Sequence, residues 1–538
     1  MKRRSPSSSP SPGPSKRQKT EASPDKGQKF GAEPATNRRK RKASDYARQP
    51  EKRQKASSNA QTGTGMARGR PKRITRWAPR VQPKPKLSSA IVNERPTTKL
   101  NVHVFGANSC GQLGLGHTQN VQVPTLNAQL SKNTVGVVQL SAGGTHCVAL
   151  THDNKVLTWG YNRDGQLGRE TSKEEDEEEE VEETDTPSVK EREMTPTEVD
   201  FTHLDLSEDT EFTQVVATES ATFVLTDEGD VIGWGTFRGK GKVKANDDDE
   251  EENDIVAFLP GTTIQRTPMY IPLIKDIKAL AAGSQHVLAV DAERAVWAWG
   301  ANKRGQVGRK VMERQAGSSL NPRKCYFPSG KWGGHKFDIE NIGAGGYHSF
   351  AIRSNGEVYA WGYNMHGQTG ICDDVLNKDS SVPLPRAITF PKKVGTLDGE
   401  RVESIVGGES HSLAVTEDNR CLSWGSIEGA ALGIREEDLV EDSILYDNDT
   451  PTPRILAVPA LVTNIEGKSM FAAAGPSHSI VVTAKGNAFG WGSNDEFEVS
   501  QNETAYVEVP TLVRSEELDE ARVVAATAGT QFTVLLTE

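Results

Sequence analysis

The sequence predicts an all-β fold, a seven-bladed β-propeller closed by pairing of its N- and C-terminal strands. Two phrases carry this prediction, because each of them occurs seven times along the chain. The first is an alternating apolar stretch followed by glycines, as in "VLTWGYNRDGQLG" from Val156, and the second is "AGGTHCVAL" from Ala142. Recurrence at a regular period is the signature of a repeat architecture.

In the first phrase an aromatic residue is followed by glycine. These glycines are Gly106, Gly160, Gly235, Gly300, Gly362, Gly425 and Gly492. Six of the nine tryptophans precede such a glycine, and Phe105 is the seventh aromatic residue. Because alternation of apolar and polar residues is typical of a β-strand, each copy predicts a strand followed by a glycine-rich loop, the glycine loop.

The second phrase precedes the first, and in five copies it contains a histidine. Its copies begin at Ala142, Ala217, Ala282, Ala344, Gly407, Ala474 and Ala528. Each runs through a short turn such as "THDNK" into the next first phrase, a pattern that predicts a hairpin. With short apolar segments such as "VVQLSA" beside them, the hairpins predict seven small antiparallel sheets in radial order.

The order of the phrases predicts a closed ring. The folded part starts with a first phrase, "KLNVHVFG", and ends with a second, "FTVLLTE". Only circular pairing gives each a partner strand, so residues 99–106 and 532–538 are expected to share one sheet. A linear solenoid would need capping repeats instead.

Residues 1–96 are expected to form a disordered basic tail, and residues 97–538 the propeller. Residues 1–99 contain 27 Lys plus Arg against 6 Asp plus Glu, a net charge of +21, whereas the rest of the chain carries −30. A Ser-, Pro- and Lys-rich segment buries too little apolar surface to offset its ordering entropy. The cluster "RRKRK" is of the kind that nuclear import receptors bind; it comprises Arg38, Arg39, Lys40, Arg41 and Lys42.

A second basic cluster of the tail spans residues 68–73. Arg68, Gly69, Arg70 and Pro71 are similar to the core of an AT-hook, in which arginines flanking a glycine enter a narrow A·T minor groove. Neutralisation of phosphates, to which Lys72 and Arg73 would also contribute, is the alternative. Both hypotheses make chromatin, through DNA or histones, an expected partner.

Acidic runs near residues 173–193 and 246–254 lie between expected strands. Blocks of like charge predict self-repelling loops, and attraction of basic partners is the alternative. No stretch approaches the roughly 20 apolar residues of a membrane span, so no membrane partner is expected. The five cysteines are odd in number and widely separated, which argues against a zinc site or a disulfide framework. We expect no metal, no cofactor and a monomer.

The combination of "WGxNxxGQLG" with "AGxxHxxAL" resembles the regulator of chromosome condensation family over about residues 97–538. A seven-bladed member with a basic tail is similar to its exchange factors for the small GTPase Ran, and "GRETS" and "WGTFR" resemble the fungal ones. The resemblance implies a nuclear, chromatin-associated guanine-nucleotide exchange factor, without covalent chemistry of its own. Such a protein promotes GDP release and GTP loading on Ran, and so supports nucleocytoplasmic transport and spindle and nuclear assembly. A chromatin-bound scaffold without exchange activity is the alternative.

Hairpin geometry predicts which loops share a face. The start of the first hairpin strand lies beside the end of the second, so the "AGxxH" loops, the histidine loops, are expected beside the glycine loops. The recurring histidines are expected to be structural, because a residue required at one position of most blades serves the blade; they are His146, His286, His348, His411 and His478. Histidines in equivalent positions without paired acidic groups do not define one reaction centre, which argues against a propeller enzyme.

Residues that differ between blades are the candidates for function. Ser220, Gln285 and Asp164 are among those expected to be exposed on the loop-bearing face. The resemblance assigns the GTPase to this face; its binding candidates are Glu219, Gln285, Arg309, Glu409 and Ser410. In the family a protruding element of the third blade acts as a wedge, which makes Phe237 and Arg238 the wedge candidates. Gln285 and Ser410 depart from the Asp and His of animal members, and Phe532 replaces the last histidine.

Overall fold

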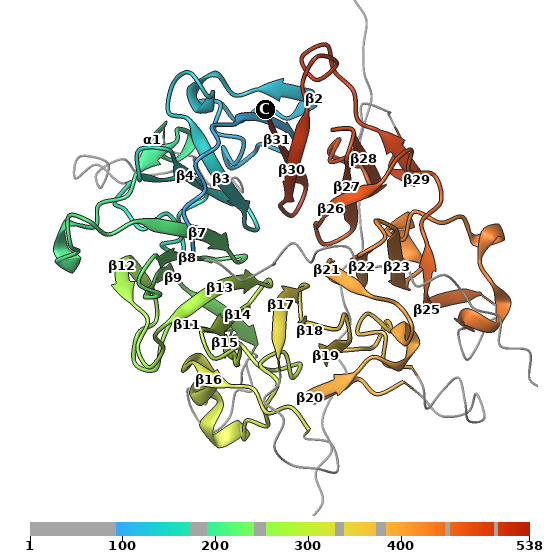
Figure 1. Ribbon diagram of the computed structural model, residues 1–538. Coiled ribbons are helices and arrows are strands. Elements are labelled where there is room, and N and C mark those ends of the chain that lie inside the picture. The colour runs from blue at the N-terminus through green and yellow to red at the C-terminus, as the bar shows by residue number, and fades with distance from the viewer. Residues whose placement is uncertain are drawn as a thin grey trace, which may run out of the picture. The chain divides into compact units, whose positions relative to one another are not determined.

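Seven antiparallel sheets surround a common centre in the computed structural model (Figure 1). The structure describes residues 93–171, 191–240, 254–328, 338–372, 384–446, 452–499 and 504–538. Within these ranges six sheets have four strands and one has five, and a separate two-stranded hairpin accompanies them. The prediction of a seven-bladed propeller is confirmed. We number the blades by their copy of the first phrase, so that the closing sheet is blade 1.

The innermost strand of each blade lines the central channel, and the second phrase supplies the next strand. From blade 2 to blade 7 and then blade 1, the innermost strands are β3 (Val137–Ala142), β7 (Phe212–Ala217), β13 (Ile277–Ala282), β17 (Ile339–Ala344), β21 (Val402–Gly407), β26 (Ser469–Ala474) and β30 (Val523–Ala528). The second strands are, in the same order, β4 (His146–Thr151), β8 (Ala221–Thr226), β14 (His286–Asp291), β18 (His348–Arg353), β22 (His411–Thr416), β27 (His478–Thr483) and β31 (Phe532–Thr537).

The first phrase forms the third strand of every blade, and shorter segments form the outer edge. The third strands are β5 (Val156–Gly160), β9 (Val231–Gly235), β15 (Val296–Gly300), β19 (Val358–Tyr363), β23 (Cys421–Ser426), β28 (Ala488–Ser493) and β1 (Asn101–Gly106). The outer strands are β6 (Thr197–Glu198), β12 (Gln265–Tyr270), β16 (Arg323–Lys324), β20 (Ala387–Lys393), β25 (Pro453–Leu461), β29 (Tyr506–Leu512) and β2 (Val121–Leu126), with β24 (Ile444–Tyr446) outside β25.

Blade 3 carries the additional hairpin, and the helices are short. The hairpin consists of β10 (Phe237–Lys240) and β11 (Asp254–Ala257), directly after the third strand of blade 3. Among the described residues, α1 (Glu191–Met194) is the α-helix, and the 3-10 helices are η1 (Ala128–Leu130), η3 (Thr202–Leu204), η4 (Glu313–Leu320), η5 (Gly395–Leu397), η6 (Glu428–Ala430), η7 (Glu436–Asp438) and η8 (Glu441–Ser443). None of the described helices is long and apolar enough to cross a membrane.

The two ends of the propeller sequence close the ring. Strand β1 pairs antiparallel with β31, in a register that runs from Asn101 opposite Thr537 to Gly106 opposite Phe532. The predicted pairing of residues 99–106 with 532–538 is therefore confirmed. A sheet edge that would otherwise be open is covered by the other end of the chain.

The recurring tryptophans form the contacts between neighbouring blades. Trp234, for example, is fully buried, and its Nε1 donates a 2.8 Å hydrogen bond to the carbonyl oxygen of Gln166 in the glycine loop of blade 2. Gly168 in the same loop has a φ of +68°, and a Cβ there would lie 2.7 Å from the indole of Trp234. The glycines of the first phrase are therefore required by left-handed backbone and by the tryptophan of the next blade.

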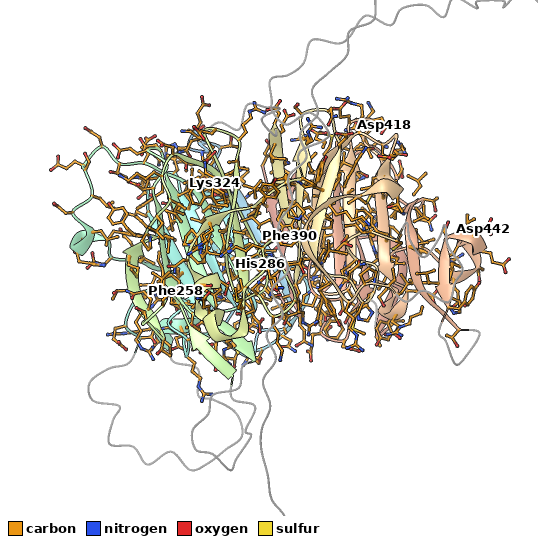
Figure 2. All side chains as sticks on the ribbon, turned by 90° about the horizontal axis from the view of Figure 1, so that it is seen from below. Phe258, His286, Lys324, Phe390, Asp418 and Asp442 are labelled. Atoms are coloured by element: carbon orange, nitrogen blue, oxygen red, sulfur yellow. The ribbon has the colours of Figure 1, made fainter. Side chains whose placement is uncertain are left out.

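The blades present two different faces. The turns between second and third strands form one of them, the turn face, where Asp418 lies (Figure 2). The histidine loops and glycine loops form the opposite one, the loop face, toward which Phe258 at the base of the hairpin lies (Figure 2).

The chain that precedes β1 contacts the turn face. Asn93 donates from Nδ2 to the carbonyl oxygens of Thr226 (2.7 Å) and Asp227 (2.8 Å) in blade 3. Arg95 forms a 3.2 Å ion pair with Glu211 and also donates to the carbonyl oxygen of His152 in blade 2. These two residues, assigned to the tail by the sequence, thus tie blades 2 and 3 together. The earlier part of the tail lies outside the described residues.

Candidate functional site

The loop face is assembled as hairpin geometry predicts. In every blade one backbone N–H of the glycine loop donates to a carbonyl oxygen of the histidine loop, at 2.8 to 2.9 Å. The seven bonds join Ala107 to Gln531, Tyr161 to Thr145, Thr236 to Ser220, Ala301 to Gln285, Tyr363 to Tyr347, Ser426 to Ser410 and Ser493 to Ser477. The expectation that the two loop sets share one face is confirmed.

Backbone hydrogen bonds also link the histidine loops of successive blades around the channel. The N–H of Glu219 donates to the carbonyl oxygen of Ser284 (2.9 Å), and that of Ser284 donates to Gly346 (3.1 Å). The N–H of Glu409 donates to Pro476 (2.9 Å). The channel is a cavity of about 420 Å³, lined mainly by Gly and Ala, and Glu219 and Glu409 are among its lining residues. The rim of the channel is thus a fixed backbone frame that carries two exposed carboxylates.

The five recurring histidines are structural ties between blades. The Nε2 of His348, for example, lies 2.8 Å from the hydroxyl of Ser412 in the next blade, and this hydroxyl donates to the carbonyl oxygen of Gln368 at 2.8 Å. Equivalent contacts join His146 to Thr222, His286 to Ser349, His411 to Ser479 and His478 to Thr533. Burial lowers the pKa of His348 to about 3, so its imidazole is neutral and does not serve as a proton carrier near neutral pH.

The blades without this histidine also lack the hydroxyl partner. Ala221 replaces the histidine in blade 3, and Val287 stands at the partner position of blade 4. Phe532 replaces it in blade 1, and Cys147 stands at the partner position of blade 2. In each pair, the Ser or Thr directly follows the histidine position of the next copy of the phrase. This spacing in the sequence was therefore a signal that the histidine pairs with a hydroxyl of the next blade.

Two of the predicted binding residues are in direct contact. The Nε2 of Gln285 donates to the Oε2 of Glu219 at 2.8 Å. Glu219 is exposed as expected, but Gln285 is only 3 % exposed and Ser220 is also 3 % exposed. Gln285 and Ser220 therefore do not offer the exposed surface that the sequence predicted. Gln285 lies between the backbone N–H of Arg238 and the carboxylate of Glu219. Gln285 orients Glu219 instead.

Glu409 and Ser410 lie on the same face, in the histidine loop of blade 6. Glu409 is exposed, whereas Ser410 is half-buried. The backbone oxygen of Glu409 accepts a 3.2 Å hydrogen bond from the Nε2 of Gln368. The carboxylate of Glu409 is thus positioned by its backbone and available to a partner.

Arg309, a predicted binding residue, is held by backbone oxygens of its own blade. Its guanidinium donates to the carbonyl oxygens of Ala298 (2.7 Å), Ser319 (3.0 Å) and Asn321 (2.9 Å). Burial lowers its pKa to about 10, so the group remains charged at neutral pH. Arg309 therefore fastens the loop after Gly308 to its own blade, and its donors are directed into the protein.

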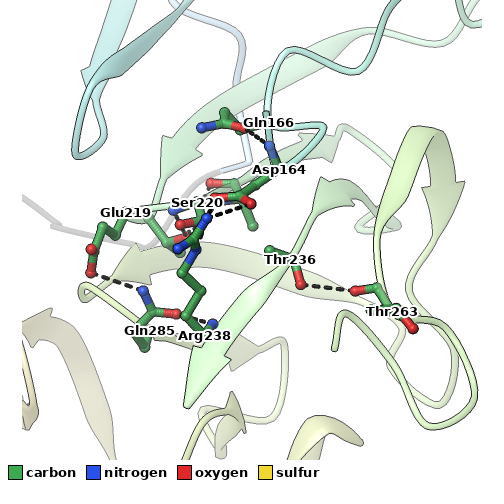
Figure 3. A network of polar contacts seen from close by, with 10 residues as sticks. Asp164, Gln166, Glu219, Ser220, Thr236, Arg238, Thr263 and Gln285 are labelled. Atoms are coloured by element: carbon green, nitrogen blue, oxygen red, sulfur yellow. Dashed lines mark hydrogen bonds and ion pairs between the residues drawn. The ribbon is translucent and has the colours of Figure 1, made fainter. Parts of the chain in front are cut away.

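The two wedge candidates lie at the base of the β10–β11 hairpin. Phe237 is 2 % exposed and stacks on Phe223 and Phe258, with ring centroids 5.9 and 6.0 Å away. Its ring is thus part of the core. Arg238 points along the loop face between Asp164 and Gln285 (Figure 3). Asp164, which the sequence placed among exposed residues, is 5 % exposed because Arg238 covers it.

Arg304, in the glycine loop of blade 4, lies between two tyrosines, a contact that the sequence did not predict. The guanidinium carbon of Arg304 lies 4.4 Å from the ring centroid of Tyr347 and 4.1 Å from that of Tyr363. Burial raises the pKa of Tyr347, and the nearby carboxylates of Glu219 and Glu409 raise it further. Tyr347 thus experiences both the Arg304 cation on its ring and the charges of the two exposed carboxylates. Both tyrosines lie within copies of the recurring phrases, where the sequence indicated only loop residues.

Several predicted elements lie outside the described residues. They are the basic clusters 38–42 and 68–73, most of the acidic run at 173–193, and nearly all of the run at 246–254. Among the described residues there is no group of three or more His, Cys, Asp or Glu that could hold a metal ion.

The sequence and fold match known proteins over most of their length. The RCC1-like domain family matches residues 101–535. Protein pim1 of Schizosaccharomyces pombe is 36% identical over 82% of this chain and 76% of pim1. Guanine nucleotide exchange factor SRM1 of Saccharomyces cerevisiae is 30% identical over 81% of this chain and 86% of SRM1. The crystal structure of Prp20p from Saccharomyces cerevisiae matches with a TM-score of 0.70 at 29% identity, over 83% of this chain and 93% of Prp20p. The chain belongs to the regulator of chromosome condensation family, whose RCC1-like domain forms its propeller.

Proposed function

We propose that this protein is a guanine-nucleotide exchange factor for the small GTPase Ran, and that its loop face binds the GTPase. The proposal is carried by the similarity to guanine nucleotide exchange factor SRM1, which extends over four-fifths of both chains. The loop face supports it, because the exposed carboxylates of Glu219 and Glu409 line the channel rim, and the cation of Arg304 packs on Tyr347, another residue of that lining.

The proposed mechanism needs binding energy and no nucleophile. A GTPase holds its nucleotide through a phosphate-cradling loop, a lysine and Mg²⁺. A partner that prefers the nucleotide-free state weakens nucleotide binding by the same factor, since coupling between two binding sites is reciprocal. The carboxylates of Glu219 and Glu409 can pair with the cationic lysine of such a loop. The β10–β11 hairpin can act as a wedge beside it.

We further propose that the tail holds the protein on chromatin in the nucleus. Prp20p is reported together with its binding to Gsp1p and histones, and yeast RCC1 (Prp20) has been crystallised bound to Kap60. In this chain the clusters 38–42 and 68–73 supply positive charge for an import receptor and for DNA or chromatin. Removal of residues 1–92 is expected to preserve nucleotide exchange and to weaken salt-sensitive nucleosome binding. An unchanged nucleosome affinity would exclude this role.

A scaffold without exchange activity is the second candidate function. It is favoured by the departures at Gln285 and Ser410 from the aspartate and histidine of animal members. The contact between Gln285 and Glu219 weakens that argument, because Gln285 keeps an acidic group oriented on the face.

A nucleotide-release assay separates the two functions. Ran loaded with fluorescent GDP is mixed with the full chain and excess GTP, and the release rate is expected to rise with chain concentration until it saturates. The double variant Glu219→Gln/Glu409→Gln is expected to release GDP about 100-fold more slowly at subsaturating concentration, because each of the two lost charge pairs is worth about 1.4 kcal/mol, a factor of about ten. The matched variant Glu417→Gln, in an exposed ion pair with Arg401 on the turn face, should release at the wild-type rate. Release by the wild-type chain at the spontaneous rate would leave only the scaffold function.

A further inference from the structure

Asp164 is a buried carboxylate in the glycine loop of blade 2. It is 5 % exposed, and its backbone N–H donates to the Oε1 of Gln166 at 2.9 Å. The carboxylate faces Arg238 of the next blade, whose Nε lies 2.9 Å from Oδ2 and whose Nη2 lies 2.6 Å from Oδ1. This bidentate arrangement fixes the plane and direction of the guanidinium more strictly than a single contact does. Asp164 therefore determines where the Arg238 side chain points.

The backbone of Arg238 is held by a second contact, which comes from blade 4. Its N–H donates to the Oε1 of Gln285 in blade 4 at 2.5 Å, and the Nε2 of the same amide donates to Glu219 at 2.8 Å. The chain of contacts Asp164, Arg238, Gln285 and Glu219 therefore crosses three successive blades (Figure 3). Because the amide of Gln285 has one acceptor and two donors, it joins the hairpin and the exposed carboxylate into one network.

This network fixes the base of the hairpin, because Arg238 belongs to its first strand. Arg238 is the second residue of β10 and stands opposite Val256 of β11. Directly before it, Phe237 is stacked in the core. The core ring fixes where the hairpin begins, and the ion pair fixes the next residue, so together they set the direction in which the two strands leave the blade.

We propose that Asp164 is a positioning residue for nucleotide exchange, which acts by fixing the base of the β10–β11 hairpin through Arg238 and by orienting Glu219 through Gln285. This inference rests on the proposed exchange function, and Asp164 itself touches neither the GTPase nor its nucleotide. Loss of its charge leaves the hairpin and the rim carboxylate less well placed. A misplacement of the order of 1 Å in a preorganised site can cost a factor of about 100 in rate.

The test compares Asp164→Asn, which has the same shape without the charge, with Asp164→Glu, which restores a carboxylate. Glu417→Gln again serves as the ion-pair control on the turn face. Amide hydrogen exchange over residues 236–258 reports the hairpin independently of Ran. Release of fluorescent GDP, measured over a range of Ran concentrations up to saturation, gives kcat and KM. Thermal unfolding of each variant verifies that the propeller remains folded.

Asp164→Asn is expected to accelerate amide exchange in the hairpin segment and to lower kcat about ten-fold or more, with KM changed less than about three-fold. Asp164→Glu is expected to recover at least part of both losses. Unchanged amide hydrogen exchange of the hairpin in Asp164→Asn would refute the claim that Asp164 anchors the hairpin. Accelerated amide hydrogen exchange with a wild-type kcat would refute its positioning role in nucleotide release. A wild-type chain that releases no GDP would instead refute the proposed function, while the hydrogen-exchange result would still decide whether Asp164 anchors the hairpin.

Discussion

Acidification is expected to destabilise the propeller through its five buried histidines. Burial lowers the pKa of His146, His286, His348 and His478 to about 3, and that of His411 to about 4. In the unfolded chain an imidazole has a pKa of about 6.5. Between these values the unfolded chain binds more protons than the folded one. The stabilisation is therefore complete above pH 6.5 and is lost progressively as the pH falls below it.

The size of this loss follows from the same pKa values. Between pH 7.5 and pH 5.5 each histidine lowers the free energy of unfolding by about 1.4 kcal/mol, so five of them lower it by about 7 kcal/mol. This is comparable with the whole stability of many domains. Burial also lowers the pKa of His103 and His366, which adds to the loss. Burial raises the pKa of Glu498, which opposes the loss because protonation of this carboxyl favours the folded state.

One interface between blades shows which residues can replace a histidine and its hydroxyl partner. Phe532 and Cys147 occupy the positions that elsewhere hold the histidine and its hydroxyl, so the double variant His348→Phe/Ser412→Cys copies a pairing that the fold accepts. Urea unfolding followed by tryptophan fluorescence is expected to show a loss of about 1–3 kcal/mol at pH 7.5. The further loss between pH 7.5 and 5.5 should be about 1.4 kcal/mol smaller than in the wild type. An exposed substitution, His152→Gln, is the control. A variant with the wild-type dependence on pH would refute the assignment of the acid sensitivity to these histidines.

Three further predictions concern stability and are checked by urea unfolding. In Arg309→Lys the free energy of unfolding is expected to fall by about 2–4 kcal/mol, since lysine cannot reproduce the planar set of bonds to three carbonyl oxygens. Slower GDP release by an equally stable variant would instead indicate direct contact with the GTPase. Arg95→Ala is expected to lose about 1–3 kcal/mol, because its side chain is largely buried between blades 2 and 3; wild-type stability would show that this contact is dispensable. Deletion of residues 532–537 removes the strand that closes the ring and is expected to abolish the cooperative transition; a wild-type transition would contradict the role of this pairing.

The repeated phrases were sufficient to predict the fold. Trp234 and its equivalents fill the space between blades, and Gly168 must adopt a left-handed conformation beneath that indole. These are local requirements that recur in each blade, so they leave a periodic signal in the sequence. The closing pair β1 and β31 was predictable for a related reason, because the order of the phrases left one strand without a partner at each end.

The candidate site was predictable only in part. The face and the exposed carboxylates of Glu219 and Glu409 followed from hairpin geometry and from differences between blades. The burial of Gln285 and Asp164 did not, because Gln285 contacts the backbone N–H of Arg238 and Asp164 contacts its guanidinium, and such contacts between blades have no fixed spacing in the sequence. The anchoring of Arg309 within its own blade was not predictable for another reason, since its carbonyl acceptors are backbone atoms that residue types do not reveal.

The central claim, that the loop face prefers the nucleotide-free GTPase, is tested most directly with a purified complex of the full chain and nucleotide-free Ran. Titration with GDP, followed by size-exclusion chromatography or fluorescence anisotropy, is expected to dissociate the complex, because reciprocal coupling makes each ligand weaken the other. A stable ternary complex that binds GDP as tightly as free Ran does would contradict the account.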